Sequence, residues 1–308
     1  GLIILARVFL PVYYHYQCTT TTELLEMRYN NKHIRALIGL LFFLGSSFIF
    51  MPAVIYSGSL FMINMFNVDI PLMYVATAFA LIGAFYAIFG GLRAVAVSDT
   101  YSGILLLTMA IVVVVLALFA IDFDFSGIPA ERLTLIGDND SPLPWHTLLT
   151  GMIFIQTFYW STNQVITQRA MAAPNLKEAQ KGVYAAAIIR FIIVPTIIVV
   201  PGIISFKLYG DINDAAYGTL VGDVLPDWLS GVFAAALAAA VLTTYNSNLN
   251  SATALYVCDI HEAYVDKKPN VARLSGIVTA LLTVVSLLMV PVYAQAESII
   301  NLLQQLFG

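Results

Sequence analysis

The 308-residue sequence contains few charged residues. They make up 10% of the chain, whereas a soluble globular domain carries about 25%. Because 60% of the residues are hydrophobic and the mean hydropathy is +0.86, the chain has too little polar surface to stay dissolved in water. We therefore expect an integral membrane protein.

Other features are scarce as well. Two cysteines, Cys18 and Cys258, are too few for a multi-cysteine framework, so two reduced thiols are expected. The net charge of -4 is small and spread over loops, and it indicates no nucleic-acid partner. The four histidines lack metal-ligand spacing, and neither a phosphate-binding glycine loop nor a serine elbow occurs. Nothing in the sequence supports an enzyme.

Long apolar runs without period-two alternation predict membrane-spanning helices and not barrel strands. We expect seven full spans, at 34–65, 71–89, 94–121, 146–168, 183–208, 229–257 and 274–292. Partial spans are expected at both ends, over 1–14 and after Ser298. The chain begins without Met inside an apolar run, so we expect an internal piece of a longer, transporter-sized protein.

Lysine and arginine are unequally distributed between alternate loops. One side holds Arg28, Lys32, Arg35, Arg93, Arg169, Lys177, Lys181, Lys267, Lys268 and Arg273. The other side holds only Arg132 and Lys207. Since positive residues stay on the cytoplasmic side, the first set is predicted to be cytoplasmic. The loops 122–145 and 209–227 are then extracytoplasmic.

A polar stretch interrupts one of the apolar spans. Gln156, Tyr159 or Trp160, Asn163 and Thr167 recur at three- and four-residue spacing, which places them on one helical face. Amides can bond hydroxyl groups and an aromatic ring can cover a ligand's apolar face, so this face suits a neutral polyhydroxyl ligand. Hydrogen bonding between helices is the alternative use of such residues.

The alanine-rich span 229–257 contains adjacent hydroxyl groups at Thr243 and Thr244. Alanines one turn earlier leave space in which a small hard cation could meet oxygen atoms. No carboxylate lies in this patch, so a monovalent ion fits better than Ca²⁺ or Mg²⁺. The alternative is close packing of small residues, with the hydroxyl groups bonded to the carbonyls of their own helix.

Two ionisable residues lie inside predicted spans. Arg190 would cost about 2.5 to 3.5 kcal/mol at the centre of a membrane helix. We therefore expect it to be hydrated or paired, or to snorkel to the cytoplasmic face. Asp99 lies near the cytoplasmic end of its span, where it is either an interfacial acid at a helix N-terminus or part of an ion path.

Six blocks, in order along the chain, carry a resemblance. They are Thr22–Asn30, Gly90–Val95 with Asp99, Tyr159–Trp160 with Asn163–Gln164, Gln168–Arg169, Glu178–Gly182, and Leu249–Ser251 with Asp259–Ile260. In these blocks the sequence resembles the sodium:solute symporter family, whose best-known members are the sodium/glucose cotransporters. The resemblance implies an all-α membrane protein with a five-plus-five inverted-repeat transporter fold, in which solute and sodium bind near the midplane at two interrupted helices.

This resemblance implies a single transmembrane transporter domain over 1–308. The domain would run from the end of the second core helix to the start of the tenth, and so be incomplete at both ends. The stretch Gln156–Arg169 would be the second interrupted helix. The first interrupted helix, which supplies the remaining sodium ligands and several solute contacts, would lie outside the chain.

The resemblance also implies roles for single residues. Tyr159 would cover the solute as a gate on its cytoplasmic side, and Gln156 would bond its hydroxyl groups. Arg190 matches a solute-contacting lysine, and an arginine there could also suit a carboxylate-bearing solute. The expected solute contacts are Gln156, Tyr159, Trp160, Asn163, Arg190 and Gln304. The expected sodium contacts are Ala240, Thr243 and Thr244, with Asp99 on the sodium exit route.

The sequence therefore predicts a multi-pass protein of the cell membrane that couples sodium to the symport of an organic solute by alternating access. Na⁺ is the expected coupling ion, a sugar or polyol the expected solute, and the lipid bilayer the surroundings. Two alternatives stay open. One is a symporter for proline, sialic acid or a carboxylate, and the other is a membrane sensor module fused to a signalling domain.

Overall fold

The computed structural model describes residues 1–134, 136–137, 139, 144–266 and 268–295. Over this part of the chain the secondary structure is helical, apart from one isolated bridge between Gly137 and Pro144. The predicted solute contact Gln304 lies outside the described residues. The elements in chain order are α1 (Leu2–Ile4), η1 (Leu5–Phe9), α2 (Leu10–Tyr16), α3 (Glu23–Tyr29), α4 (Lys32–Gly45), η2 (Ser46–Phe50), α5 (Met51–Phe66), α6 (Leu72–Ala120), η3 (Ala130–Arg132), α7 (Trp145–Leu149), α8 (Gly151–Thr162), α9 (Gln164–Met171), α10 (Leu176–Tyr209), η4 (Asn213–Ala215), α11 (Ala216–Val224), α12 (Asp227–Ala254), η5 (Leu255–His261), α13 (Glu262–Tyr264) and α14 (Val271–Ala294).

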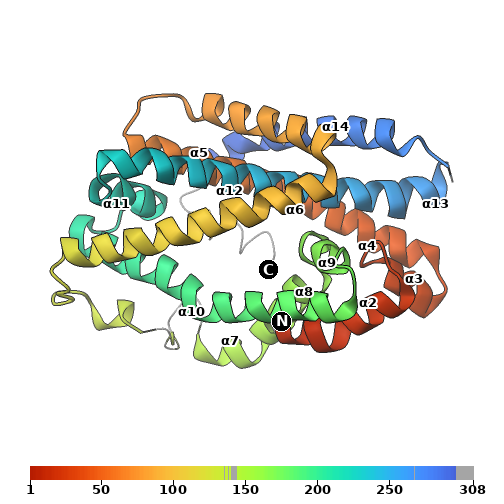
Figure 1. The fold of residues 1–308 in the computed structure, drawn as a ribbon, viewed down its shortest axis with the longest axis horizontal. Helices are drawn as coiled ribbons and strands as arrows, with labels where there is room; N and C mark the ends of the chain where they lie inside the picture. The colour runs from red at the N-terminus through yellow and green to blue at the C-terminus, as the bar shows by residue number, and fades with distance from the viewer. Residues whose placement is uncertain (135, 138, 140–143, 267, 296–308) are drawn as a thin grey trace.

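The helices form two groups. Figure 1 shows α5, α6, α12 and α14 packed together along one half of the molecule, with α2, α8, α9 and α10 in the other half. Contacts of α10 with α6, and of α12 with α9, join the halves. The core of the first group is apolar and includes fully buried Met51, Ile55, Tyr245, Leu249 and Tyr293.

Six helices in the described chain are long and apolar enough to cross a membrane. They are Lys32–Phe66, Leu72–Gly90, Ala96–Ala120, Leu176–Tyr209, Asp227–Tyr264 and Val271–Ala294. Large apolar side chains on these helices face outward, such as Phe191, which is 84% exposed, and Leu288, which is 70% exposed. An apolar outer surface of this kind suits hydrocarbon and not water. Each of the six helices matches a predicted span.

The seventh predicted span, 146–168, is not one helix. The chain is divided there into α7, α8 and α9, with breaks at Thr150 (φ −107°, ψ −93°) and Asn163 (ψ 121°). The Asn163 side chain starts α9, because its Oδ1 accepts a hydrogen bond from the Val165 backbone N–H at 2.9 Å. The prediction from hydropathy of one continuous helix over 146–168 is therefore wrong. The chain forms an interrupted helix here, as the family resemblance implies.

The helix α6 contains two membrane spans. The Tyr86 hydroxyl donates to the Ser98 hydroxyl at 3.0 Å, although twelve residues of straight helix would separate them by about 18 Å. The element must therefore turn back on itself, and Figure 1 shows its two arms in that arrangement. The predicted end of a span at Gly90-Gly91 agrees with this reversal.

Two helices widen just before a proline. The π-helical segments η1 and η2 directly precede the helices that carry Pro11 and Pro52 near their starts. Proline has no N–H, and its ring crowds the carbonyl four residues earlier. For Pro52 that carbonyl belongs to Phe48, and it instead accepts a hydrogen bond from the buried Tyr293 hydroxyl at 3.1 Å. The first helix continues to Tyr16, two residues beyond the expected partial span 1–14.

Small residues bring helices into close contact, as their spacing in the span 34–65 suggests. A Cβ atom added at Gly58 would lie 2.6 Å from a methyl carbon of Val241. One added at Gly83 would lie 2.6 Å from the Tyr245 ring. Both glycines face α12, so α5 and α6 approach that helix more closely than an alanine would allow.

Candidate functional site

Three of the predicted solute residues lie together on α8 and α10. The Trp160 indole N–H donates to Gln156 Oε1 at 2.8 Å. The Arg190 guanidinium lies over the Trp160 ring, with Cζ 4.3 Å from the ring centroid. A cation stacked on an indole is a favourable contact. The structure therefore brings together Gln156, Trp160 and Arg190, which are separated by up to 34 positions in the sequence.

Tyr159 lies on the same helix and is 36% exposed. Its ring packs edge-to-face against Trp160, with centroids 5.2 Å apart, and tilted against Phe50, with centroids 6.3 Å apart. Phe50 belongs to η2, so Tyr159 bridges the broken helix and the helix that contains Pro52. Sequence reasoning did not single out Phe50, because an apolar residue in an apolar span carries no distinguishing signal.

The predicted polar face ends at the helix break. Thr167 was placed on the same face as Gln156, yet it is fully buried and its hydroxyl donates to the Asn163 carbonyl at 2.9 Å. That face was drawn for one continuous helix, and the extended backbone at Asn163 removes the continuity. Thr167 thus bonds the start of its own helix, and neither a solute nor another helix. We name the remaining set, Gln156, Tyr159, Trp160, Asn163 and Arg190, the donor wall.

The predicted sodium residues lie on α12, which is unbroken at that point. Thr243 is buried, and its hydroxyl lies 3.2 Å from the Ala240 carbonyl oxygen, to which it donates. The Thr244 side chain is exposed. These oxygen atoms are the hard ligands that Na⁺ requires. An intact helix releases no backbone carbonyls, so further ligands would have to come from outside α12. The assignment stays a prediction.

Asp99 is paired with an arginine. Its Oδ2 atom accepts hydrogen bonds from Arg169 Nε at 3.0 Å and from Arg169 Nη2 at 2.5 Å. Both side chains are about one-quarter exposed, with 28% for Arg169 and 26% for Asp99. If Asp99 lies on an ion route, Arg169 must release at least part of its bonding to the Asp99 carboxylate.

A short segment, residues 19–22, connects the broken helix to η5 and is called the strap. The buried Gln164 side chain holds it from one side: Oε1 accepts from the Thr21 backbone N–H at 2.9 Å, and Nε2 donates to the Thr19 carbonyl at 3.2 Å. Gln164 is the first residue of α9, directly after the break. The strap therefore fixes the start of α9.

Asp259 of η5 holds the strap from the other side. Its side chain is fully buried and accepts from the hydroxyls of Thr20, at 2.8 Å, and Thr22. Arg35 Nε donates to the same carboxylate at 2.8 Å, and Arg35 Nη1 donates to Glu26 at 2.9 Å. These three partners, a cation and two hydroxyl groups, compensate the cost of burying the Asp259 charge.

This network corrects the expected start of the short helix α3. The spacing of Thr20 and Glu23 predicts a capping box, but the Thr20 hydroxyl bonds Asp259 and the helix begins at Glu23. Only the reverse half of the motif forms, since Glu23 Oε2 accepts from the Thr19 backbone N–H at 2.7 Å and from that of Thr20 at 3.4 Å.

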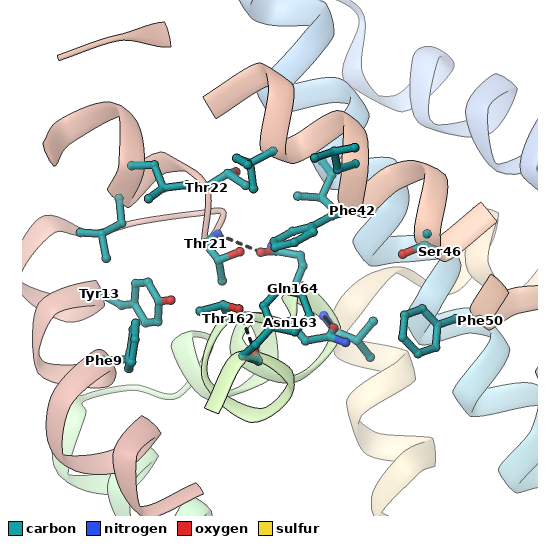
Figure 2. Close-up of a pocket in the computed structure, with 18 of the residues that line it drawn as sticks. Phe9, Tyr13, Thr21, Thr22, Phe42, Ser46, Phe50, Thr162, Asn163 and Gln164 are labelled. Carbon is teal, nitrogen blue, oxygen red and sulfur yellow. Dashed lines mark hydrogen bonds between the residues drawn. The ribbon is translucent and has the colours of Figure 1, made fainter. Parts of the chain in front are cut away.

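A cavity of about 660 Å³ lies between the strap, α2, α4, η2 and the broken helix. Its walls are mostly apolar, including Phe9, Phe42, Phe50 and Phe158. Figure 2 shows the hydroxyl groups of Tyr13, Thr21 and Ser46 directed toward its interior. Of the donor wall, Asn163 lines this cavity, whereas Gln156, Tyr159, Trp160 and Arg190 do not, so Asn163 faces the cavity and the rest of the wall lies outside it.

Several residues that hold this region together were not predicted individually: Thr20, Thr21, Arg35, Gln164, Ser251 and Asp259. Three of them, Gln164, Ser251 and Asp259, belong to the six blocks, and the blocks bond one another. Thr22 bonds Asp259, Asp99 bonds Arg169, and Ser251 donates to Gln168 Oε1 at 3.0 Å. Polar residues recurring inside apolar spans were the available signal, because such groups require partners.

Metal-binding clusters of another kind are not found. Within the described ranges, no group of three or more His, Cys, Asp or Glu side chains could hold a metal ion.

The chain is similar to proteins of one family throughout its length. A profile of the Sodium:solute symporter family matches residues 1–308. The uncharacterized symporter YidK of Escherichia coli (strain K12) is 35% identical over 100% of this chain and 57% of its own length. The sodium/glucose cotransporter of Vibrio parahaemolyticus is 30% identical over 91% of this chain and 58% of its own length.

Two further relatives bear on solute and fold. The sodium/myo-inositol cotransporter 2 of Oryctolagus cuniculus is 28% identical over 96% of this chain and 50% of its own length. The solved structure of a Na⁺-coupled sialic acid symporter, in a substrate-bound outward-open state, matches with a TM-score of 0.81 at 19% identity. That match covers 96% of this chain and 66% of the other. The chain thus spans about half the length of the curated relatives that it matches.

Proposed function

Because the chain belongs to the sodium:solute symporter family, we propose that it forms part of a sodium-coupled symporter for a sugar-like organic solute, working by alternating access in the cell membrane. The chain is multi-pass and has part of the all-α, five-plus-five inverted-repeat fold of such symporters, and Na⁺ is the coupling ion. The observation that carries the solute site is the polar donor wall on α8, one turn before a helix break inside the membrane region.

In this proposal the donor wall holds the solute. Tyr159 and Trp160 offer ring faces to the apolar face of a sugar ring, and Gln156 offers its amide group. Tyr159 of α8 packs on Phe50 of η2, so a movement of α8 relative to η2 would uncover or close the solute. The glucose and inositol carried by two similar proteins support a sugar-like solute, as their names state.

Sodium would bind at the oxygen atoms of Ala240, Thr243 and Thr244. The Thr243 hydroxyl would turn from the Ala240 carbonyl to the ion, and both oxygens would then point to the same cation. Asp99 would lie on the route by which sodium leaves, with Arg169 as the group that competes for its carboxylate. The reaction contains no catalytic step, since solute and ion are moved unchanged.

The test is the sodium dependence of solute uptake by the full-length protein in proteoliposomes. Thr243→Ala removes one hydroxyl ligand, and we expect the sodium concentration for half-maximal uptake to rise about tenfold, which corresponds to about 1.4 kcal/mol. Thr196→Ala is the matched control, because the Thr196 hydroxyl also donates to its own helix, at 3.0 Å to Ile192. An unchanged sodium dependence in Thr243→Ala would remove this residue from the ion site.

A further inference from the structure

We infer that Tyr13 of α2 is a positioning residue for the solute. Its hydroxyl group replaces a helical hydrogen bond that the break at Asn163 removes, and in this way it fixes the end of α8 that carries Tyr159 and Trp160. The inference rests on the proposed function, because it gives Tyr13 a part in holding the proposed solute contacts of α8 in place.

The break leaves one backbone carbonyl of α8 without its helical donor. In a continuous α-helix the Val165 N–H would donate to the Ser161 carbonyl, four residues earlier. Here the Val165 N–H donates to Asn163 Oδ1 instead, at 2.9 Å. Ser161 is fully buried, and a buried carbonyl without a donor is costly, above all inside a membrane. The Ser161 carbonyl therefore needs a donor from another element.

Tyr13 supplies that donor. Its hydroxyl donates to the Ser161 carbonyl at 3.0 Å, and its side chain is only 2% exposed. Figure 2 shows this hydroxyl directed toward Thr162, the last residue of α8. The break thus exchanges one helical hydrogen bond for two side-chain bonds. One joins Asn163 to the freed N–H, and the other joins Tyr13 to the freed carbonyl.

Few other hydrogen bonds hold α8 in place. The helix has 12 residues, with irregular backbone at both ends, at Thr150 and Asn163. In the part of the chain that the structure describes, two hydrogen bonds join α8 to an element other than its neighbours α7 and α9. Both lie at Ser161: one comes from Tyr13, and the other runs from the Ser161 hydroxyl to the Gly1 carbonyl at 3.3 Å. The orientation of α8 therefore depends on the contact with Tyr13.

The proposed solute contacts lie next to this anchor. Tyr159 and Trp160 directly precede Ser161, and Gln156 lies on the same helix, where its Oε1 accepts from the Trp160 indole N–H at 2.8 Å. A shift at the end of α8 would therefore move both rings and the amide together. Binding groups must be held to within about 0.5 Å of their productive positions, so loss of the anchor should weaken solute binding.

The neighbouring tyrosine provides a matched control. The Tyr14 hydroxyl donates to the carbonyls of Ala170, at 3.0 Å, and Ala173, at 2.9 Å, at the end of α9 and just beyond it. Tyr13 therefore holds α8, whereas Tyr14 holds the far end of α9. Each Tyr→Phe substitution removes a hydroxyl donor and keeps the ring, so the two variants differ in which half of the broken helix they release.

The test is the apparent KM for solute uptake by the full-length protein in proteoliposomes with an inward sodium gradient. Labelled glucose, galactose and myo-inositol are the probes. We expect Tyr13→Phe to raise the apparent KM of each transported probe by a factor of about three to ten, the worth of one hydrogen bond. The sodium concentration for half-maximal uptake at saturating solute should stay unchanged, because the proposed sodium contacts lie on another helix, α12. Tyr14→Phe should leave the apparent KM unchanged.

A combination with Asn163→Ala tests the exchange of bonds itself. Asn163→Ala removes the acceptor of the Val165 N–H, which can then bond the Ser161 carbonyl as in a continuous helix. The Tyr13 hydroxyl is then no longer the one donor within reach of that carbonyl. Tyr13→Phe should therefore raise the apparent KM by a smaller factor in the Asn163→Ala background than in the wild type. An equal factor in both backgrounds would contradict the exchange.

The outcomes separate this inference from the proposed function. Sodium-driven uptake with an unchanged apparent KM in Tyr13→Phe, or with an equal rise in Tyr14→Phe, overturns the positioning role of Tyr13 and leaves the symporter proposal intact. If none of the probes is taken up in a sodium-dependent way, the proposed function fails, and the inference fails with it.

Discussion

Single residues in this chain are informative where a polar group is buried. Asp259, Arg35 and Gln164 lie in apolar surroundings, yet each has partners from other elements. From the sequence, such residues can be recognised as needing partners, because an unpaired polar group is costly in a membrane. Which partner each one meets could not be read, since Asp259 and Arg35 are 224 positions apart.

The buried carboxylate leads to a stability prediction. Asp259→Ala removes the fully buried anion that Arg35 Nε bonds, and leaves the Arg35 side chain, which is only 15% exposed, with Glu26 and Glu23 alone. Removing one partner of a buried ion pair costs about 3 to 5 kcal/mol, so we expect a clear fall in the thermal unfolding temperature in detergent. Glu178→Ala is the control, since its pair with Lys181 is exposed and worth about 0 to 1 kcal/mol. Equal unfolding temperatures for the two variants would contradict the role of Asp259.

The indole N–H of Trp160 leads to a binding prediction. Trp160→Phe keeps an aromatic ring under Arg190 but removes the donor that orients the Gln156 amide. If Gln156 binds the solute, the apparent KM for the solute should rise by a factor of about three to ten, the worth of one hydrogen bond. Sodium-driven uptake by the variant and the wild type in proteoliposomes measures this. An apparent KM equal to that of the wild type would show that the orientation of Gln156 does not affect solute binding.

At the scale of elements, hydropathy located the spans and missed what interrupts them. The six long helices agree with the expected ranges, because apolar length is what a bilayer requires. The break at Asn163 was not visible in hydropathy, since no proline or glycine marks it. It became an expectation only through the family resemblance, and the amide of Asn163 supplies its local cause.

The proline in the helix from Lys32 to Phe66 leads to a second stability prediction. The Tyr293 hydroxyl donates to the carbonyls of Phe48 and Ile49, at 3.1 and 3.0 Å, next to the π-helical segment before Pro52. Tyr293→Phe leaves these buried carbonyls without that donor, at a cost of about 1 to 3 kcal/mol. The measurement is the unfolding temperature in detergent. Tyr74→Phe is the control, because Tyr74 is 71% exposed.

A double variant checks the cause of this effect. In Pro52→Ala the backbone N–H returns and can bond the Phe48 carbonyl within the helix. The loss caused by Tyr293→Phe should then shrink. An undiminished loss in the Pro52→Ala background would mean that the Tyr293 hydroxyl stabilises the helix independently of Pro52, as through its bond to the Ile49 carbonyl at 3.0 Å.

At the scale of the whole molecule, blocks that are far apart in the sequence meet in space. The strap joins α9 to η5, Asp99 joins α6 to α9, and Ser251 joins α12 to α9. All three connections end on or beside the second half of the broken helix, so its position depends on three other elements. The order of the blocks was readable from the sequence, but their convergence on α9 was not, because hydropathy carries no information about pairing.

Some of the predicted site residues lie together in the structure, and others do not. The structure brings Gln156, Trp160 and Arg190 into contact and keeps Tyr159 beside them. It places Thr167 in a structural role and leaves Gln304 outside the described residues. Helical periodicity predicts neighbours only as far as a helix continues, which is why the predicted face was correct before Asn163 and wrong after it.

The central claim, that sodium drives solute movement, is tested most directly by accumulation against a gradient. Proteoliposomes that contain the full-length protein are given an inward tenfold sodium gradient at zero membrane potential. For each coupled ion this gradient supplies about 1.4 kcal/mol, so the internal solute concentration should rise transiently to about ten times the external one. The same gradient of potassium should give none. Equal solute concentrations inside and outside under the sodium gradient, with transport occurring, would contradict the account.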